Sequence, residues 1–147
     1  MSGRNYRTGS YSHQAKSVRL WGWAVGAGAG ADMTLQYWNP STKAIATAPS
    51  TGWQGIKSVT YNAATGKYKI NLQDRFNYLL GFNVCAVALD GSTAPVTPTM
   101  YIESIAVNDA TAPSLAVVTT NGAGTATAPT SNTRFMFCLV LSDSSAP

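Results

Sequence analysis

The sequence has few of the side chains that carry out enzymatic chemistry. Among 147 residues it contains one histidine and six acidic residues, and charged residues make up 11% of the chain. A typical soluble domain has about 25% charged residues. A serine or cysteine nucleophile needs a base, and the single histidine, His13, lies in a polar amino-terminal segment. We therefore predict that the protein is not an enzyme and has no catalytic residues.

Metal and cofactor sites also lack support in the sequence. Two cysteines cannot form a Cys-based zinc site, and no Asp-x-Asp loop of the kind that binds calcium is present. Residues 26–31 alternate Gly and Ala, without the G-x-G-x-x-G spacing and following amphipathic helix of a dinucleotide-binding fold. We expect no cofactor and no metal, and we interpret this run as a loop, or as a strand closely approached by another backbone.

Long apolar runs are missing as well. None approaches the length needed to cross a bilayer, and the first sixteen residues lack the apolar region of a secretory signal. We expect a protein that folds in a cytosol and makes no membrane contact. Cys85 and Cys138 lie in apolar, strand-like runs, which favours free buried thiols, with a cross-strand disulfide as the alternative.

The net charge of +4 comes from one end of the chain. The first nineteen residues contain no acid and four basic residues, and the remainder is neutral, with six of each sign. Four charges are too sparse for a nucleic-acid-binding patch, so we expect no direct nucleic-acid contact. The pattern predicts a flexible basic arm over residues 1–16. We assign docking on a neighbouring protein to the basic residues Arg4, Arg7, Lys16 and Arg19, and a solvated tail is the alternative.

Short apolar segments recur along residues 17–147, and no window has a sustained helical period. The clearest hairpin joins residues 58–61 to 67–72 through a connection that ends in Gly66. About eight such segments, separated by Pro-rich and Gly-rich stretches, predict a single all-β domain over residues 17–147. We expect an antiparallel β-sandwich, jelly-roll-like, with no helix longer than two turns.

The last apolar segment, residues 135–141, is apolar on both faces of a strand. A strand of a two-layer sandwich normally has one polar face. Double-sided apolar character indicates either a covered central strand or an oligomer interface, and the scarcity of surface charge favours oligomerisation. The residues that we assign to the core or to an oligomer interface are Phe135, Met136, Phe137 and Val140.

Several large aromatic residues fall close together in the sequence, namely Trp21, Trp23, Tyr37, Trp38 and Trp53. Trp21 and Trp23 would project from the same face of a strand. We favour packing in the sandwich core or at a subunit interface, where large rings contribute the most buried area. The alternative is an exposed platform for sugar rings, formed by Trp21, Trp23 and Trp38.

The carboxyl-terminal third carries a family resemblance. Its segments are Val107–Ala110, Ala116–Thr120, Gly122–Ala126, Ala128–Pro129 and Leu139–Ser145, so that an apolar strand is followed by an Asp-Ser-Ser tail. This pattern resembles the carboxyl end of small tailed-phage virion proteins, the capsid decoration (cement) proteins and related head or fibre proteins. The resemblance implies a β-sandwich subunit, commonly a trimer, that binds the major capsid protein on the outer capsid lattice.

These considerations lead to two expectations about function. The first is a structural virion protein, made in the host cytoplasm and located on the capsid surface, where it stabilises the lattice. The alternative is a phage fibre or host-attachment module that recognises carbohydrate through its tryptophans. The first predicts that the tryptophans are buried in the core or in an interface. The second predicts exposed aromatic rings in a groove.

Overall fold

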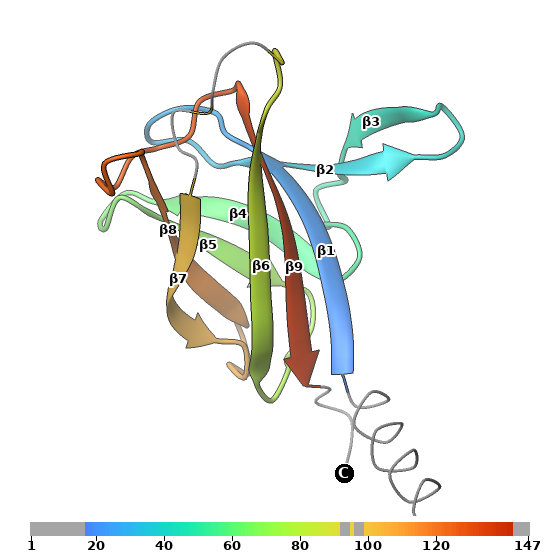
Figure 1. Cartoon of the computed structure of the whole chain (residues 1–147). Helices are drawn as coiled ribbons and strands as arrows, with labels where there is room; N and C mark the ends of the chain where they lie inside the picture. The colour runs from blue at the N-terminus through green and yellow to red at the C-terminus, as the bar shows by residue number, and fades with distance from the viewer. Residues whose placement is uncertain (1–16, 92–94, 96–98, 143–147) are drawn as a thin grey trace, which may run out of the picture.

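A computed structural model describes residues 17–91, 95 and 99–142. The expected arm over residues 1–16, with Arg4, Arg7 and Lys16, lies outside the described residues. Nine strands are present in the described part (Figure 1). They are β1 (Ser17–Val25), β2 (Thr34–Asn39), β3 (Ala44–Thr47), β4 (Ile56–Asn62), β5 (Lys67–Leu72), β6 (Leu79–Ala88), β7 (Thr99–Ala106), β8 (Ser114–Thr120) and β9 (Thr133–Ser142).

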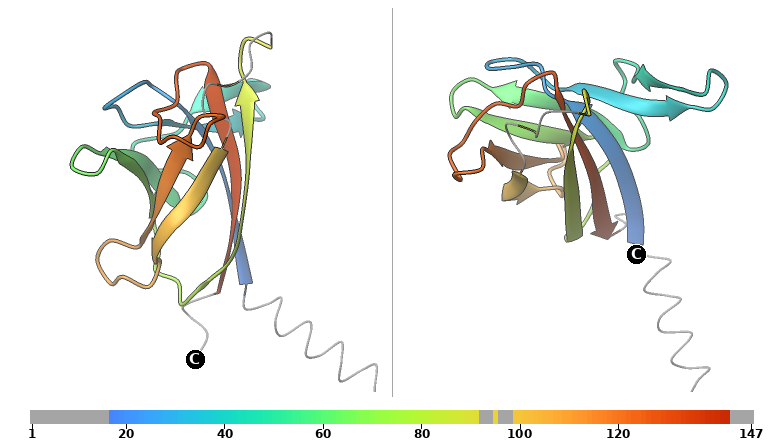
Figure 2. Two further views of the ribbon diagram at one scale, coloured as in Figure 1. Left: turned by 60° about the vertical axis from the view of Figure 1, so that its left-hand side comes forward. Right: turned by 45° about the horizontal axis from the view of Figure 1, so that its top comes forward.

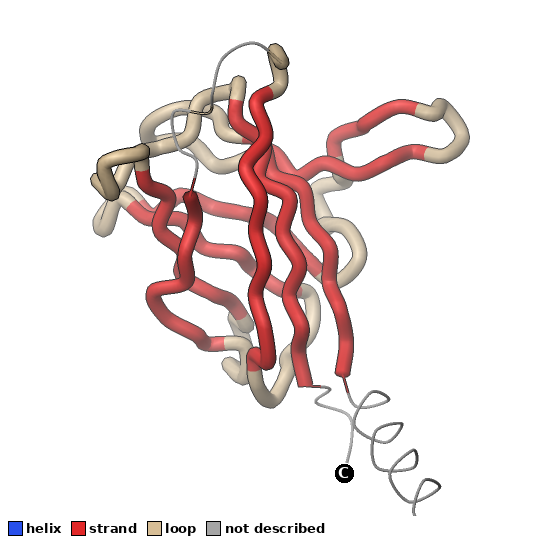
Figure 3. Tube along the Cα trace, in the orientation of Figure 1, coloured by secondary structure: helices blue, strands red, loops and turns tan. Residues whose placement is uncertain are grey.

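The strands form two antiparallel sheets that pack against each other (Figure 2). The first sheet has the order β3-β2-β1-β9-β6, and the second has the order β4-β5-β8-β7. No helix occurs among the described residues (Figure 3). The predicted all-β sandwich is confirmed, and the jelly-roll topology stays a prediction. The described part has nine strands, where about eight were expected, and the short strand β3 lies in a stretch rich in Ser, Thr, Ala and Pro.

Alternation along each strand determines which side chains enter the core. In β5, Tyr68, Ile70 and Leu72 are buried, while Lys69 points outward. The β4–β5 hairpin follows the sequence prediction, and Gly66 adopts a positive φ of 69° in its connection. Burying alternate apolar residues from both sheets in this way creates one continuous core between the two layers.

Strand β9 lies in the middle of the first sheet, between β1 and β6. Its inward side chains, Phe135, Phe137, Leu139 and Leu141, are at most 1% exposed. Its other face is directed away from the core, where Met136 is 38% exposed and Val140 is partly exposed. The four residues assigned together from the sequence therefore divide between the two faces, with Phe135 and Phe137 in the core and Met136 and Val140 on the outer face.

The segment after β1 matches both interpretations of the Gly/Ala run. Gly26 is buried, and a side chain there would collide with the backbone of Pro129 and Thr130. Its N–H donates to the Thr133 carbonyl over 2.9 Å. Gly28 and Gly30 have positive φ values of 93° and 79° in an open loop. The run thus begins with a close backbone approach and continues as a loop.

A β-ribbon extends beyond the sandwich. β2 pairs with β1 only from Thr34 to Gln36 and then continues beside β3 to Asn39. Figure 1 shows this hairpin projecting away from the remaining strands. All residues of β3 are exposed or only partly buried, so the outer part of the ribbon adds little to the core.

The first testable prediction concerns the contact between β1 and β9. Gly22 faces the core beneath the Phe137 ring, and the Cβ of an alanine at this position would lie 2.7 Å from Cδ1 of Ile56. We expect Gly22→Ala to lower the free energy of unfolding by about 1–3 kcal/mol, because an overpacked core forces its side chains off their preferred rotamers.

The matched control is Gly122→Ala, since nothing lies within 4 Å of the new methyl group there. Urea denaturation of both variants checks the prediction. Equal midpoints for Gly22→Ala and Gly122→Ala would contradict the close packing of β1 on β9.

Candidate functional site

The outer face of the first sheet carries the tryptophans. In β1, Leu20, Gly22 and Ala24 are buried against the core, so alternation directs Trp21 and Trp23 outward. Trp21 is 59% exposed. Trp38 lies on β2, on the same side of the sheet, and is 51% exposed. Core packing, one half of the favoured interpretation from the sequence, is therefore wrong for Trp21 and Trp38. Burial of these rings in a subunit interface stays a prediction.

Strand register aligns the tryptophans with residues of β9 and β6. Trp21 lies opposite Cys138, and Trp23 lies opposite Met136. On the other side of β9, Met136 lies opposite Cys85. We call this outer surface, formed by the outward residues of β1, β2, β9 and β6, the tryptophan face.

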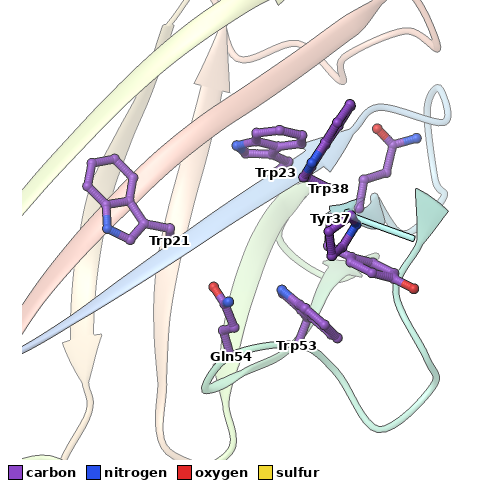
Figure 4. A pocket seen from close by; sticks show the side chains of 8 residues that line it. Trp21, Trp23, Tyr37, Trp38, Trp53 and Gln54 are labelled. Atoms are coloured by element: carbon purple, nitrogen blue, oxygen red, sulfur yellow. The ribbon is translucent and has the colours of Figure 1, made fainter. Parts of the chain in front are cut away.

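An aromatic groove of about 420 Å³ opens beside β1 (Figure 4). It lies where β2 diverges from β1, and β2 contributes Trp38 from one face and Tyr37 from the other. Trp53 comes from the loop between β3 and β4. The groove is lined by the rings Trp21, Trp23, Tyr37, Trp38 and Trp53 and by the amide side chains of Gln36 and Gln54.

The loop that carries Trp53 is held in place by hydrogen bonds. The backbone of Trp53 and Ile56 exchanges two bonds of 2.7 Å and 3.0 Å. Gln73 accepts from the Gly55 N–H over 2.9 Å and donates to the Thr51 carbonyl over 2.8 Å. The Trp53 ring then stacks on Tyr37 with 4.1 Å between ring centroids. The base of the groove is thus fixed by contacts within the chain.

Trp23 is positioned by Arg134 of β9. The guanidinium carbon lies 5.7 Å from the Trp23 ring centroid, and Nε donates to Oε1 of Gln36 over 3.1 Å. This arrangement ties together β9, β1 and β2 on the tryptophan face. Burial lowers the pKa of Arg134 from its usual value, but an arginine remains charged at neutral pH.

A second hollow, of about 220 Å³, lies on the other side of Trp21 and Trp23. We call it the sulfur-lined hollow, because its walls include Cys85, Met136 and Cys138. Both cysteines are free, so the disulfide alternative has no support. Cys138 is buried as expected, but Cys85 is exposed, because it faces outward from the edge strand β6.

The first sheet is almost free of charge. Its five strands contain no acidic residue and two arginines, Arg19 and Arg134. Arg19 is exposed on the tryptophan face, two residues before Trp21 in β1. The second sheet differs, since its strands carry Lys57, Lys67, Lys69 and Glu103, and Lys67 forms an ion pair with Glu103. The tryptophan face is therefore apolar and weakly positive.

Other kinds of site are not found in the described part of the chain. No group of three or more His, Cys, Asp or Glu residues there has an arrangement able to hold a metal ion. None of the described segments is a helix long and apolar enough to span a membrane. No protein-family model, curated protein or solved structure matches the chain.

Trp21, Trp23 and Trp38 form the candidate platform predicted from the sequence, and the structure brings these three together. Tyr37, Trp53, Gln36 and Gln54 were not predicted as part of that platform. Their place in the groove depends on the divergence of β2 from β1 and on a loop anchored by Gln73, which is distant in sequence. No local sequence pattern reports either feature.

The two cysteines provide a test of this geometry. We expect a thiol reagent such as Ellman's reagent to modify one cysteine per native chain, Cys85, because Cys138 is only 6% exposed. Denaturant should reveal the second thiol. Cys85→Ser serves as the control and should abolish the fast reaction. Rapid modification of two thiols in the native protein would contradict the burial of Cys138.

Proposed function

We propose that this protein is a structural virion protein, a capsid decoration protein that docks through the tryptophan face. One observation carries the proposal: an exposed sheet face combines tryptophan, methionine and arginine and lacks lysine, aspartate and glutamate. The cores of protein–protein interfaces have this composition, with Trp, Met and Arg enriched and Lys, Asp and Glu depleted. Contiguous exposed apolar surface of this kind usually marks an interaction site.

The position of the basic residues supports docking on a protein surface. Arg19 projects from the tryptophan face. Ser17, where β1 begins, pairs with Ser142 at the end of β9, so the chain enters the first sheet at one end of this face. Residues 1–16, with Arg4, Arg7 and Lys16, precede that point in the sequence. The arm is thereby attached next to the docking face, from which it can reach a neighbouring protein.

The partner in this proposal is the major capsid protein of the same virion, and the protein acts as an oligomer, with a trimer favoured. Many equivalent sites on a capsid allow modest individual contacts to produce strong attachment, because the second contact of an oligomer is effectively intramolecular. No catalytic group and no cofactor is required for this role. The resemblance of the carboxyl-terminal third to small phage virion proteins points to the same class.

A charge on the tryptophan face tests the proposal. We expect Met136→Lys to weaken binding to particles that lack the protein by at least about tenfold, because it places an ammonium group in the apolar centre of the interface. The matched control is Tyr101→Lys, which changes a side chain that is 51% exposed on the second sheet.

Both variants should melt within a few degrees of the unmodified protein, because neither side chain belongs to the core. Co-sedimentation with particles measures the binding. Equal binding of Met136→Lys and Tyr101→Lys would exclude the tryptophan face as the docking surface.

A second candidate function, carbohydrate recognition by a fibre or host-attachment module, has its own supporting observation. The aromatic groove combines exposed indole rings with two amide side chains, Gln36 and Gln54, and aromatic rings with nearby hydrogen-bonding groups can stack on and orient sugars. This function predicts that soluble oligosaccharides change the tryptophan fluorescence and that Trp38→Ala abolishes the change. Particle binding unaffected by Met136→Lys, together with saturable sugar binding, would favour it.

A further inference from the structure

Within the described part of the first sheet, a stretch of β1 has an open edge on the side of β2. β1 and β2 are paired only where Trp23, Ala24 and Val25 lie opposite Gln36, Leu35 and Thr34. Beyond this point β2 turns away beside β3, while β1 continues for several more residues toward Ser17. Among the described residues, no strand pairs with residues 18–22 of β1 on this side. We call this open angle between β1 and β2 the fork.

Register determines which backbone groups point into the fork. The Gly26 N–H donates to the Thr133 carbonyl, and continuation of the β1–β9 register places these two residues opposite each other. In an antiparallel ladder, hydrogen-bonded pairs alternate with pairs that are not bonded. Leu20 and Gly22 therefore bond toward β9. The N–H and C=O groups of Arg19 and Trp21 point the opposite way, into the fork.

The aromatic groove borders this open edge. Trp21 lies on β1, and Trp38 and Tyr37 project from opposite faces of β2 across the fork. An extended segment placed in the fork would thus bond to backbone groups of β1, and its alternate side chains would meet aromatic rings on either face. Strand addition to an exposed edge works in this way, with backbone bonds that give affinity and side-chain pockets that give selectivity.

We propose that the fork accepts an extended segment from residues 1–16 of a second copy of this chain, so that the copies are joined by exchanged arms. The composition of the arm suits the groove. It contains Tyr6 and Tyr11, whose rings pack on tryptophan, and Arg4 and Arg7, whose guanidinium groups are attracted to indole faces. It contains no acidic residue and no proline between these positions.

The length and attachment of the arm allow it to reach a neighbour. Sixteen extended residues span at most about 53–58 Å, which exceeds the roughly 36 Å diameter expected for a domain of this size. Since the arm joins the body at Ser17, at the open end of the fork, an arm leaving one copy starts beside the edge that another arm would occupy. An arm-to-fork contact is heterologous, and such contacts close into rings when the rotation between copies permits it.

A return of the arm onto its own β1 is disfavoured by turn chemistry. A tight hairpin before Ser17 would require Gly, Asn or Asp in its turn, but residues 12–16 read Ser-His-Gln-Ala-Lys. A turn at Gly9 would place residues 1–7 opposite residues 10–16, short of Arg19 and Trp21. The arm of a second copy is under neither restriction.

Proline substitution at an outward-pointing backbone position tests the inference. Arg19→Pro removes an N–H that points into the fork and leaves the ladder to β9 intact, whereas Arg19→Ala removes the same side chain and keeps the N–H. We expect Arg19→Pro to raise the dissociation constant for self-association at least about tenfold relative to Arg19→Ala. Sedimentation velocity over a dilution series measures both constants, and circular dichroism with thermal melting checks that both variants fold.

A peptide experiment on the unmodified full-length chain covers the case in which Arg19→Pro does not fold. A synthetic peptide of residues 1–16, added in excess, should occupy the fork and lower the mass of the oligomer. A scrambled peptide of the same composition should not. Equal effects of the two peptides would overturn the inference, as would equal dissociation constants for the two Arg19 variants.

The inference rests on the proposed function in taking the protein to act as an oligomer. It names a second copy of this chain as the target of the arm, and it is measured on purified protein without particles. A stable monomer at micromolar concentration overturns it and leaves capsid docking through Met136 untouched. A monomer whose particle binding is weakened much more by Arg19→Pro than by Arg19→Ala would assign the fork to a strand of the capsid protein and overturn arm exchange. Saturation of the groove by oligosaccharide, with no effect of the peptide, would also overturn it.

Discussion

The pairing of β9 with both β1 and β6 is the constraint on which the domain and its candidate site depend. Because β9 is central, its inward residues Phe135, Phe137, Leu139 and Leu141 fill the core from the middle of the first sheet. The same register sets the outer face, where it aligns Trp21 with Cys138 and Trp23 with Met136. A shift by one residue would exchange the two faces and place tryptophan in the core. The aromatic surface and the core are therefore specified by one set of backbone bonds.

Much of the fold could be predicted from sequence because alternation is a local signal. The β4–β5 hairpin is an example, with buried Tyr68, Ile70 and Leu72 separated by outward polar residues and a glycine in its connection. For β9 the sequence clearly predicted a strand but not which of its faces is directed to the core, since both faces are apolar. The structure resolves the ambiguity through partners distant in sequence, as Met136 lies between Trp23 and Cys85.

The candidate site could be predicted only in part, because it depends on how strands diverge. Trp21 and Trp23 are two residues apart, and this spacing was enough to place both on one face of a strand. It could not show that this face is outward, because an alternating strand reads the same in either orientation and tryptophan is usually buried. The burial of Gly22 under Phe137 makes the difference: the small residue between the two tryptophans is where the core comes closest to β1. The fork, and with it Tyr37 and Trp53, arises from tertiary pairing that leaves no local trace.

The β2–β3 ribbon has a consequence for the dynamics of the domain. A two-stranded ribbon is at best marginally stable by itself, and this one is anchored mainly through Leu35, Tyr37 and its short pairing with β1. Its outer amides, near Ile45 and Trp38, should exchange with deuterated solvent through local opening, well before those of β9, which open only with the whole domain. One wall of the aromatic groove thus belongs to the part of the sheet that is least protected from hydrogen exchange. The opposite wall belongs to the part that is most protected. Occupation of the groove would connect the two, and slower exchange along β2 and β3 would be its visible sign.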